Sequence, residues 1–255
     1  MKIATWNVNS VKARLPRVLE FIEQHRPDAL CLQETKSTAD AFPHMAFAEV
    51  GYVAADYSTG AWAGVAVVAP RDAPPTDVMC GLPGAPLADE ARWIEASVGG
   101  VRVVSTYVIN GRTVEDPMYA AKLDFLDAMA HRVDALAGVP LVVAGDFNIA
   151  PADLDVYDPA AFAGATHVTP EERARLAALH ARGLQDAFRR VQPDTVRYTW
   201  WDYRAGNFHK NLGLRIDLAL VSSDLAERLH ACDIDRDYRK GPRPSDHAPL
   251  ILEFD

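Results

Sequence analysis

Short apolar runs alternate with polar segments along the chain and predict a protein rich in β-strands. Continuous apolar runs of four to eight residues are typical of strands buried on both faces of a sheet. The clearest run is Val139–Ala144, which lies between two glycines, Gly138 and Gly145. We expect the other strands at residues 3–5, 29–33, 51–55, 64–69, 92–98, 101–109, 197–201, 214–221 and 249–254.

Three segments have apolar residues at helical spacing and begin with the usual start signals of helices. Proline is favoured at the first helical position, so Leu15-Pro16 predicts a helix that ends before Pro27. Asp116 predicts the cap of a second helix, and Pro170 opens a third that continues to about residue 181. One face of the second helix is apolar and comprises Tyr119, Leu123, Leu126, Ala130 and Val133.

The order of these elements predicts a layered α/β fold. Helices alternate with groups of strands, which fits sheets that are covered by helices. At 255 residues the chain is long enough for a large core in one or two domains. We expect one domain spanning residues 1–255, because the polar clusters described next require both ends of the chain to lie together.

Five short polar clusters end or interrupt the apolar runs and contain the side chains best suited to chemistry. They are Trp6-Asn7-Val8-Asn9, Gln33-Glu34-Thr35-Lys36, Gly145-Asp146-Phe147-Asn148, Leu214-Arg215-Ile216-Asp217 and Ser245-Asp246-His247. A carboxylate at the mouth of a buried strand needs a partner, because burying an unpaired charge is costly. Four acids and one histidine in such positions predict a shared cation. Glu34 supplies the hard oxygen ligand that Mg²⁺ prefers.

The third and fifth clusters carry the most specific chemical signal. Residues two apart in an extended segment share a face, so Asp146 can hold or deprotonate a water that Asn148 orients. His247 can donate to a phosphoryl oxygen while Asp217 holds its tautomer. Each cluster alone is also typical of an ordinary turn beside a strand. Their recurrence at strand ends favours the functional interpretation.

Aromatic residues mark a further candidate surface. Trp200-Trp201-Asp202-Tyr203-Arg204 places three rings and a cation close together, and an alternating strand cannot bury all three rings. Rings beside arginine suit stacking on the bases or sugars of a nucleic acid. Tyr107, just before Asn110-Gly111-Arg112, can direct a hydroxyl into the site, although a core tyrosine fits the pattern nearly as well.

The charge of the chain is acidic overall but unevenly distributed. A net charge of -9 argues against a polyanion-binding surface that covers the whole protein. Residues 197–243 nevertheless contain nine Lys or Arg against seven Asp or Glu. This local basic excess allows a phosphate-binding face on an otherwise acidic protein, but the charge alone does not establish one.

Several classes of protein are excluded or disfavoured by what the sequence lacks. Cys31, Cys80 and Cys232 are too few and too scattered for a disulfide framework, so we expect reduced thiols and a cytoplasmic protein. No apolar run has the length of a membrane span, and polar residues interrupt the N-terminal one. Gly-x-Ser-x-Gly, Walker and Cys-x-x-Cys motifs are absent, which disfavours a serine or cysteine nucleophile.

The five clusters and the aromatic segment resemble the exonuclease III family of apurinic/apyrimidinic (AP) endonucleases. That family belongs to the endonuclease/exonuclease/phosphatase superfamily, which includes deoxyribonuclease I. The resemblance covers essentially the whole chain. Gly145–Asn148 and Ser245–His247 match the superfamily in general, whereas Gln33–Lys36, Trp201–Arg204 and Leu214–Asp217 resemble its DNA-repair branch. The resemblance implies a four-layered α-β-β-α sandwich, in which two mostly antiparallel sheets are flanked by helices.

The resemblance also implies an activity and its residues. It predicts a monomeric enzyme, dependent on Mg²⁺ or alternatively Mn²⁺, that hydrolyses double-stranded DNA at abasic sites and at blocked 3′ ends. The implied catalytic residues are Tyr107, Asp146, Asn148, Asp217 and His247. The implied metal-binding residues are Asn7, Glu34, Asp146, Asn148, Asp246 and His247. The implied DNA contacts are Arg92, Asn110, Arg112, Trp200, Arg204 and Lys210.

Two other functions stay open at this point. A phosphoesterase of the same superfamily that acts on an inositol phosphate or a phospholipid fits the acidic net charge, but not the tryptophan-rich segment. A catalytically silent nucleic-acid-binding relative fits the aromatic residues. Such a protein has no need of the reactive side chains that this chain retains together, namely Asn7, Glu34, Asp146, Asn148, Asp217 and His247.

Overall fold

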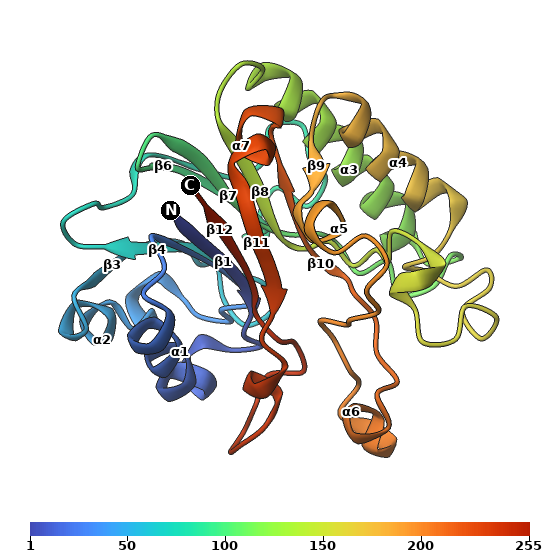
Figure 1. Cartoon of the computed structure of the whole chain (residues 1–255), viewed down its shortest axis with the longest axis horizontal. Coiled ribbons are helices and arrows are strands. Elements are labelled where there is room, and N and C mark those ends of the chain that lie inside the picture. The colour runs from blue at the N-terminus through green and yellow to red at the C-terminus, as the bar shows by residue number, and fades with distance from the viewer.

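Two six-stranded sheets form the centre of the molecule in the computed structural model, which describes residues 1–255 (Figure 1). The strands are β1 (Lys2–Asn7), β2 (Ala29–Gln33), β3 (Tyr52–Tyr57), β4 (Val65–Pro70), β5 (Thr76–Cys80), β6 (Trp93–Val98), β7 (Val101–Tyr107), β8 (Leu141–Asp146), β9 (Gln185–Asp186), β10 (Asp217–Val221), β11 (Leu229–Ile234) and β12 (Leu250–Phe254). The α-helices are α1 (Val11–His25), α2 (His44–Glu49), α3 (Pro117–Ala135), α4 (Pro170–Ala181), α5 (Ala187–Val191), α6 (Asn207–Lys210) and α7 (Ser223–Arg228).

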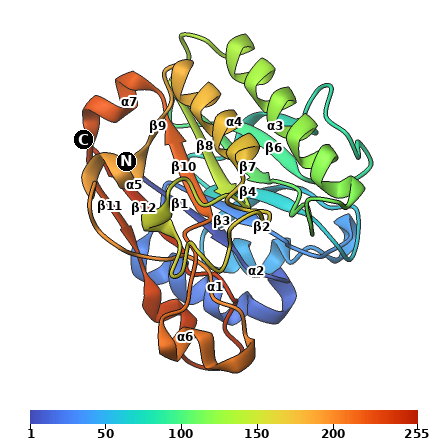
Figure 2. The ribbon, with the colours of Figure 1, turned by 90° about the vertical axis from the view of Figure 1, so that its right-hand side faces the viewer.

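The elements stack in four layers, as the resemblance implies. One sheet has the strand order β11-β12-β1-β2-β4-β3 and the other β5-β6-β7-β8-β10-β9. In both views, α1 and α2 cover the outer face of the first sheet, and α3 and α4 cover the outer face of the second (Figures 1 and 2). Only β1–β2 and β7–β8 pair in parallel, and the other pairs are antiparallel.

Alternating side chains divide the core into three apolar layers. Along β1, Ile3 faces the second sheet and belongs to the central cluster of 27 buried residues, whereas Ala4 and Trp6 pack under α1. A third cluster of 20 buried residues lies between the second sheet and the helices α3 and α4. Because both sheets are covered on both faces, their strands appear in the sequence as continuous apolar runs.

The first helix begins earlier than the sequence predicts. α1 starts at Val11, where Ser10 caps it by accepting a hydrogen bond from the Ala13 amide, and Pro16 lies inside the helix. The expectation of a start at Leu15-Pro16 was therefore wrong: the serine cap outweighed the proline signal. The helix ends at His25, and Arg26 adopts a left-handed conformation just ahead of Pro27.

Two further differences concern strands. Residues 197–201 do not form a strand, and only Trp200 makes isolated bridges, to Leu214 and His247. The exposed edge strand β5, the two-residue strand β9 and the strand β11 were not predicted, because all three carry too many polar residues to form an apolar run. The helix starts at Asp116-Pro117 and Pro170 were correct.

Both ends of the chain lie in the same sheet. β1 pairs with β12, and the amino group of Met1 donates to the carbonyl of Phe254 at 2.7 Å. This pairing brings the cluster that follows β1 next to the cluster that precedes β12, as expected from the chemistry of the polar clusters. None of the helices has the length and apolar character needed to span a membrane.

Candidate active site

Strand register delivers the polar clusters to one end of the sandwich. β1 and β2 are parallel, with Asn7 opposite Gln33, so both strands end at the same edge. β7 and β8 are also parallel, with Tyr107 opposite Asp146, and β10 runs against β8 with Asp217 opposite Asp146. The two sheets face each other, so the strand ends at Asn7 and Gln33 in the first sheet lie next to those at Tyr107 and Asp146 in the second.

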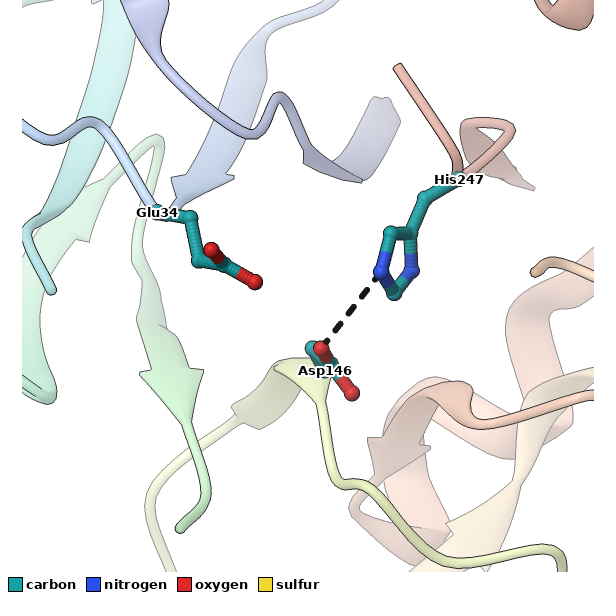
Figure 3. A group of neighbouring side chains, drawn as sticks. All are labelled: Glu34, Asp146 and His247. Carbon is teal, nitrogen blue, oxygen red and sulfur yellow. Dashed lines mark ion pairs between the residues drawn. The ribbon is translucent and has the colours of Figure 1, made fainter. Parts of the chain in front are cut away.

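Glu34, Asp146 and His247 come together where the sheets meet (Figure 3). One ligand atom of each residue lies within 4.8 Å of the others, and the closest approach of His247 Nε2 to Asp146 Oδ2 is 3.8 Å. Asp146 and His247 are buried, and the Glu34 side chain is 14% exposed. Two carboxylates and an imidazole suit a divalent cation such as Mg²⁺ or Mn²⁺, whose charge offsets the repulsion between the acids. The donor set therefore fits the implied metal.

His247 is held by Asp217 at the back of this cluster. The Nδ1 atom of His247 lies 2.8 Å from Asp217 Oδ2, and both side chains are buried. Burial alone would lower the pKa of His247, but the carboxylates of Asp217 and Asp146 raise it to about 10. With Nδ1 donating to Asp217, the protonated ring presents a second N–H at Nε2 toward the centre of the cluster.

Asp146 is buried at the centre of the acids of the site, with a residue exposure of 2%. Burial raises its pKa to about 7, the charge of His247 opposes that rise, and the carboxylates of Asp217 and Glu34 reinforce it. The backbone amide of Asn148 donates to Asp146 Oδ1 at 2.9 Å and fixes the carboxylate. An acid with this pKa can exchange a proton near neutral pH.

Asn7 bridges the two carboxylates of the cluster. Its Nδ2 atom donates to Glu34 Oε1 at 2.8 Å and to Asp146 Oδ2 at 2.9 Å. Its Oδ1 atom accepts from the Asn9 amide at 3.0 Å. In this arrangement the side-chain nitrogen, which cannot ligate a cation, faces the acids. Asn7 therefore holds the two carboxylates in place in this structure. To ligate a metal, its side-chain amide has to rotate so that Oδ1 faces the cation.

Asp246 lies beside the cluster rather than within the group of three. Its carboxylate accepts from Asn9 Nδ2 at 3.0 Å and from the indole Nε1 of Trp200 at 3.1 Å. Burial would raise the pKa of Asp246, but the His247 charge and the hydrogen bonds from Trp200 and Asn9 lower it. Trp200 is thus tied to the same network of acids as the candidate metal site.

Two residues that the sequence analysis did not select complete this network. Lys36 Nζ lies 2.8 Å from Glu34 Oε2 and donates to Asn9 Oδ1 at 2.6 Å. Asn9 in turn donates to Asp246, so a lysine and an asparagine connect the acids on the two sides of the site. Both residues belong to the polar clusters, and this membership was the signal that could have identified them.

Tyr107 and Asn148 lie at the ends of neighbouring strands of the second sheet, and the Asn148 side chain bonds Asn110 and the Val108 carbonyl. Asn148 adopts a left-handed conformation with φ of 52°, which asparagine tolerates better than most residues. Glycine is required at position 145, because a Cβ atom there would lie 1.9 Å from the Thr106 carbonyl oxygen. Burial, followed by the charges of Glu34 and Asp146, raises the pKa of Tyr107 well above its usual value. Its hydroxyl therefore stays protonated and can donate.

A cavity of about 500 Å³ opens beside Tyr107 and contains three of the predicted DNA contacts. Arg92, Asn110 and Arg112 all line it, together with Trp62, whose side chain is 83% exposed. The Arg92 guanidinium stacks over the Tyr107 ring at 4.7 Å, whereas Arg112 is 70% exposed. Asp89 and Glu90 also line the cavity, and Glu90 pairs with Arg92 at 2.6 Å, so the two arginines give the opening no net positive charge. The exposed Trp62 ring is the feature of this opening that suits stacking on a nucleic-acid strand.

The other predicted DNA contacts lie elsewhere. Trp200 is half-buried and lies at the site through its bond to Asp246. Arg204 is 86% exposed and pairs with Asp202, and Lys210 is exposed at the end of α6. Both cations belong to the segment that projects from the sandwich at the bottom of Figure 1. The site and this segment are therefore separate parts of the predicted interface.

Part of the basic excess in residues 197–243 is used inside the protein. Arg215 is fully buried and pairs with Asp155 at 2.6 Å and with Asp186 at 2.8 Å. Arg239 is also buried and packs over aromatic rings that include Trp201 and Phe208. Fewer cations remain for phosphate than the sequence count suggests.

Comparison with known proteins assigns the family. Residues 4–247 match the model of the Endonuclease/Exonuclease/phosphatase family. The chain is 32% identical to exodeoxyribonuclease III of Haemophilus influenzae over the full length of both proteins. Among solved structures, a 3′ phosphatase from Neisseria bound to a product DNA hairpin is 41% identical, with a TM-score of 0.97 and coverage of 100% of this chain and 99% of that one. An AP endonuclease from Archaeoglobus fulgidus is 34% identical, with a TM-score of 0.96 and the same coverage.

This chain belongs to the Endonuclease/Exonuclease/phosphatase family. Within that family, its full-length similarity is to enzymes of the exodeoxyribonuclease III and AP endonuclease type, which confirms the resemblance found in the sequence. The four-layered fold is confirmed by the same structures.

Proposed function

We propose that this chain is a metal-dependent DNA-repair hydrolase that cleaves phosphate esters of DNA at blocked 3′ ends and at abasic sites. The observation that carries the proposal is the convergence of Glu34, Asp146 and His247 within 4.8 Å, with Asp217 behind His247. The similar enzymes, an exodeoxyribonuclease, a 3′ phosphatase and an AP endonuclease, supply the class of substrate.

Mg²⁺, with Mn²⁺ as the alternative, is the proposed cofactor. Glu34 and Asp146 are the main proposed ligands, with Asn7, Asn148 and Asp246 around them. His247 was also a predicted ligand, but the protonated ring has no free lone pair, so we assign it the role of a hydrogen-bond donor beside the metal. A bound divalent cation supplies charge that stabilises the oxygens of the phosphate as negative charge develops.

Each catalytic side chain has a role that fits its environment. Asp146, whose pKa lies near neutrality, accepts the proton of the attacking water, and Asn148 orients that water. His247 is protonated at neutral pH and donates from Nε2 to a non-bridging phosphoryl oxygen. The protonated hydroxyl of Tyr107 donates to the same phosphate. Because these donors are fixed before the substrate binds, little reorganisation is needed in the transition state.

Double-stranded DNA is the proposed macromolecular substrate. The cavity lined by Arg92, Asn110 and Arg112 receives the strand beside the scissile phosphate, and Trp200 faces the nucleotide at the lesion. Arg204 and Lys210 contact the duplex at a distance from the site.

We also propose that the enzyme acts as a monomeric single domain in the cytoplasm. The pairing of β1 with β12 places both ends of the chain side by side in one sheet, which supports a single folding unit. Cys31 and Cys232 are buried and unpaired, as suits a reducing compartment.

The direct test is cleavage of two defined duplexes, one with a single abasic site and one with a 3′-terminal phosphate. We expect both to be cleaved with Mg²⁺ and neither in excess chelator, with activity restored by Mg²⁺ or Mn²⁺. An inositol phosphate and a phospholipid serve as competing substrates. Preference for either of these over DNA contradicts the proposal, as does full activity in the chelator.

A further inference from the structure

A fully buried ion pair lies directly behind the proposed active site. Lys122 on α3 and Glu172 on α4 have side chains that are 0% exposed, and Lys122 Nζ lies 2.5 Å from Glu172 Oε1. The surrounding α3 face is otherwise apolar, with Phe125, Leu126 and Met129 buried beside the lysine. Burying two charges in an apolar core is costly and adds little stability over apolar residues of the same size, so the pair calls for another explanation.

The Lys122 ammonium reaches two loops of the site at once. It donates to the backbone carbonyl of Asn148 at 2.7 Å and lies 3.3 Å from the carbonyl of Asn110. The side chains of those two residues meet, since Asn110 Nδ2 donates to Asn148 Oδ1 at 3.0 Å. The Lys122 ammonium group therefore holds the backbone of Asn110 and of Asn148, the two residues whose side-chain amides meet beside the site.

The backbone at Asn148 requires such support. Its left-handed φ of 52° is tolerated by asparagine but is still less favourable than the right-handed region, so contacts from the surroundings stabilise it. The same residue donates its amide N–H to Asp146 Oδ1 at 2.9 Å and its Nδ2 to the Val108 carbonyl at 3.0 Å. A shift of this turn would move both Asp146 and Asn148 relative to the phosphate.

Glu172 holds the lysine from the other side. Its carboxylate accepts from the amides of His167 and Thr169, and from the hydroxyl of Thr166. With Thr169 it also forms the capping box that starts α4. The imidazole of His167 contacts the Asn148 carbonyl at 2.5 Å, and burial together with the Lys122 charge lowers the pKa of His167 to about 4. The neighbouring ring is thus neutral, and Lys122 is the cation that faces the carbonyl.

We propose that Lys122, oriented by Glu172, is a positioning residue for catalysis that holds the carbonyls of Asn110 and Asn148 so that the site amides and Asp146 face the reacting phosphate. Neither member of the pair touches substrate or metal. This inference rests on the proposed function, because the quantity it affects is the rate of phosphate ester hydrolysis.

The test separates positioning from stability with a double variant. Lys122→Met alone leaves the Glu172 carboxylate buried without a partner and should destabilise the protein. Lys122→Met with Glu172→Gln removes both charges at nearly constant volume and should restore the thermal midpoint to near that of the wild type. We expect its kcat on the 3′-phosphate duplex to stay about 10²-fold below wild type, because a small misplacement of reacting groups has an effect of this size. Its KM should be unchanged, since neither residue contacts DNA.

Glu95 offers a matched control. It is a buried carboxylate of β6 that pairs with Arg102 of β7 at 2.7 Å and with Arg132 of α3 at 2.8 Å, and it has no hydrogen bond to a residue of the site. Glu95→Gln should lower the thermal midpoint and leave kcat within twofold of wild type at a temperature where the protein is folded. Glu172→Gln alone leaves the Lys122 ammonium without its carboxylate and should also lower the thermal midpoint. If the double variant fails to fold, Glu172→Gln replaces it, assayed at a temperature at which circular dichroism shows it folded, and kcat should be lower with KM unchanged.

The outcomes distinguish the two proposals. If wild-type enzyme does not cleave either DNA duplex, the proposed function is wrong. If wild type is active and the folded double variant, or Glu172→Gln in its place, keeps wild-type kcat, the positioning role is wrong. A fall in kcat for Glu95→Gln equal to that of the double variant also overturns it, because loss of any buried ion pair would then explain the result.

Discussion

His247 Nδ1 lies 2.8 Å from Asp217 Oδ2, and the two side chains are buried at the point where β10 begins and the chain enters β12. The other oxygen of Asp217, Oδ1, is buried without a hydrogen-bond partner. His247 is therefore the only residue that hydrogen-bonds to the Asp217 carboxylate. This is expected of a carboxylate that orients the imidazole and stabilises its protonated form.

The first prediction follows from that contact. Asp217→Asn should lower kcat by about 10- to 100-fold, the usual effect of losing a carboxylate that orients a functional histidine. Asp217 and Asp146 raise the pKa of His247 to about 10, so removing one of them lets His247 lose its proton at lower pH. The alkaline fall in the pH–rate profile should move to lower pH in the variant. An unshifted profile with normal kcat contradicts the assignment of His247 as the proton donor.

The second prediction concerns the pH dependence of metal binding. Burial raises the pKa of Asp146 to about 7 in the metal-free protein, so below that pH the carboxyl carries a proton that a cation must displace. Mg²⁺ affinity should therefore fall about tenfold per pH unit below pH 7 and level off above it, as measured by calorimetry. Asp146→Asn is the control, because its residual metal binding should lack this step. A wild-type affinity that is independent of pH between 6 and 8 argues against Asp146 as a ligand.

Trp200 is expected to act in substrate binding. Loss of a stacking ring removes about 1–3 kcal/mol per base, so Trp200→Ala should raise KM for lesion-containing DNA. The indole also donates to Asp246 Oδ2 at 3.1 Å, and Trp200→Phe removes that bond while keeping a ring. Phe should restore most of the affinity if stacking dominates. Equal defects in both variants would instead assign the effect to the Asp246 hydrogen bond.

DNA affinity should depend only weakly on salt. Each phosphate that the protein neutralises adds about 0.9 to the slope of log affinity against log salt. Arg215 and Arg239 are buried in internal contacts, which leaves seven of the nine Lys or Arg of residues 197–243 beside seven Asp or Glu, and so no basic excess in this segment. We expect a shallow slope that decreases by about 1 in Lys210→Ala, if Lys210 contacts a phosphate. A slope of zero in wild type points to a small phosphorylated substrate.

Much of the site could be predicted from the sequence because it is built from the ends of buried strands. Apolar runs locate such strands, and the polar residues that follow them, such as Glu34 and Asp146, must lie near one another once the strands pair in register. The clusters also carried the family resemblance. The same reasoning could not predict that the Asn7 amide nitrogen faces the carboxylates, because side-chain orientation depends on all neighbours at once.

The features that sequence reasoning missed depend on contacts between distant segments. Lys122 falls on the apolar face of α3, but lysine is rarely buried, so the sequence alone favours a lysine at the edge of that face with its ammonium group in solvent. Its burial depends on Glu172, which is 50 residues away. The start of α1 was missed for a local reason, because the Ser10 cap competes with the proline signal at Pro16 and prevails.

The central claim is that Asp146 activates the attacking water in a site where protonated His247 donates a hydrogen bond to the phosphate. Single-turnover cleavage of the 3′-phosphate duplex by Asp146→Asn, together with its DNA affinity, tests this most directly. Asparagine keeps the size of the side chain but removes the base, so the rate should fall by at least about 10²–10⁴-fold while DNA binding persists. Near-normal cleavage by Asp146→Asn would contradict the account.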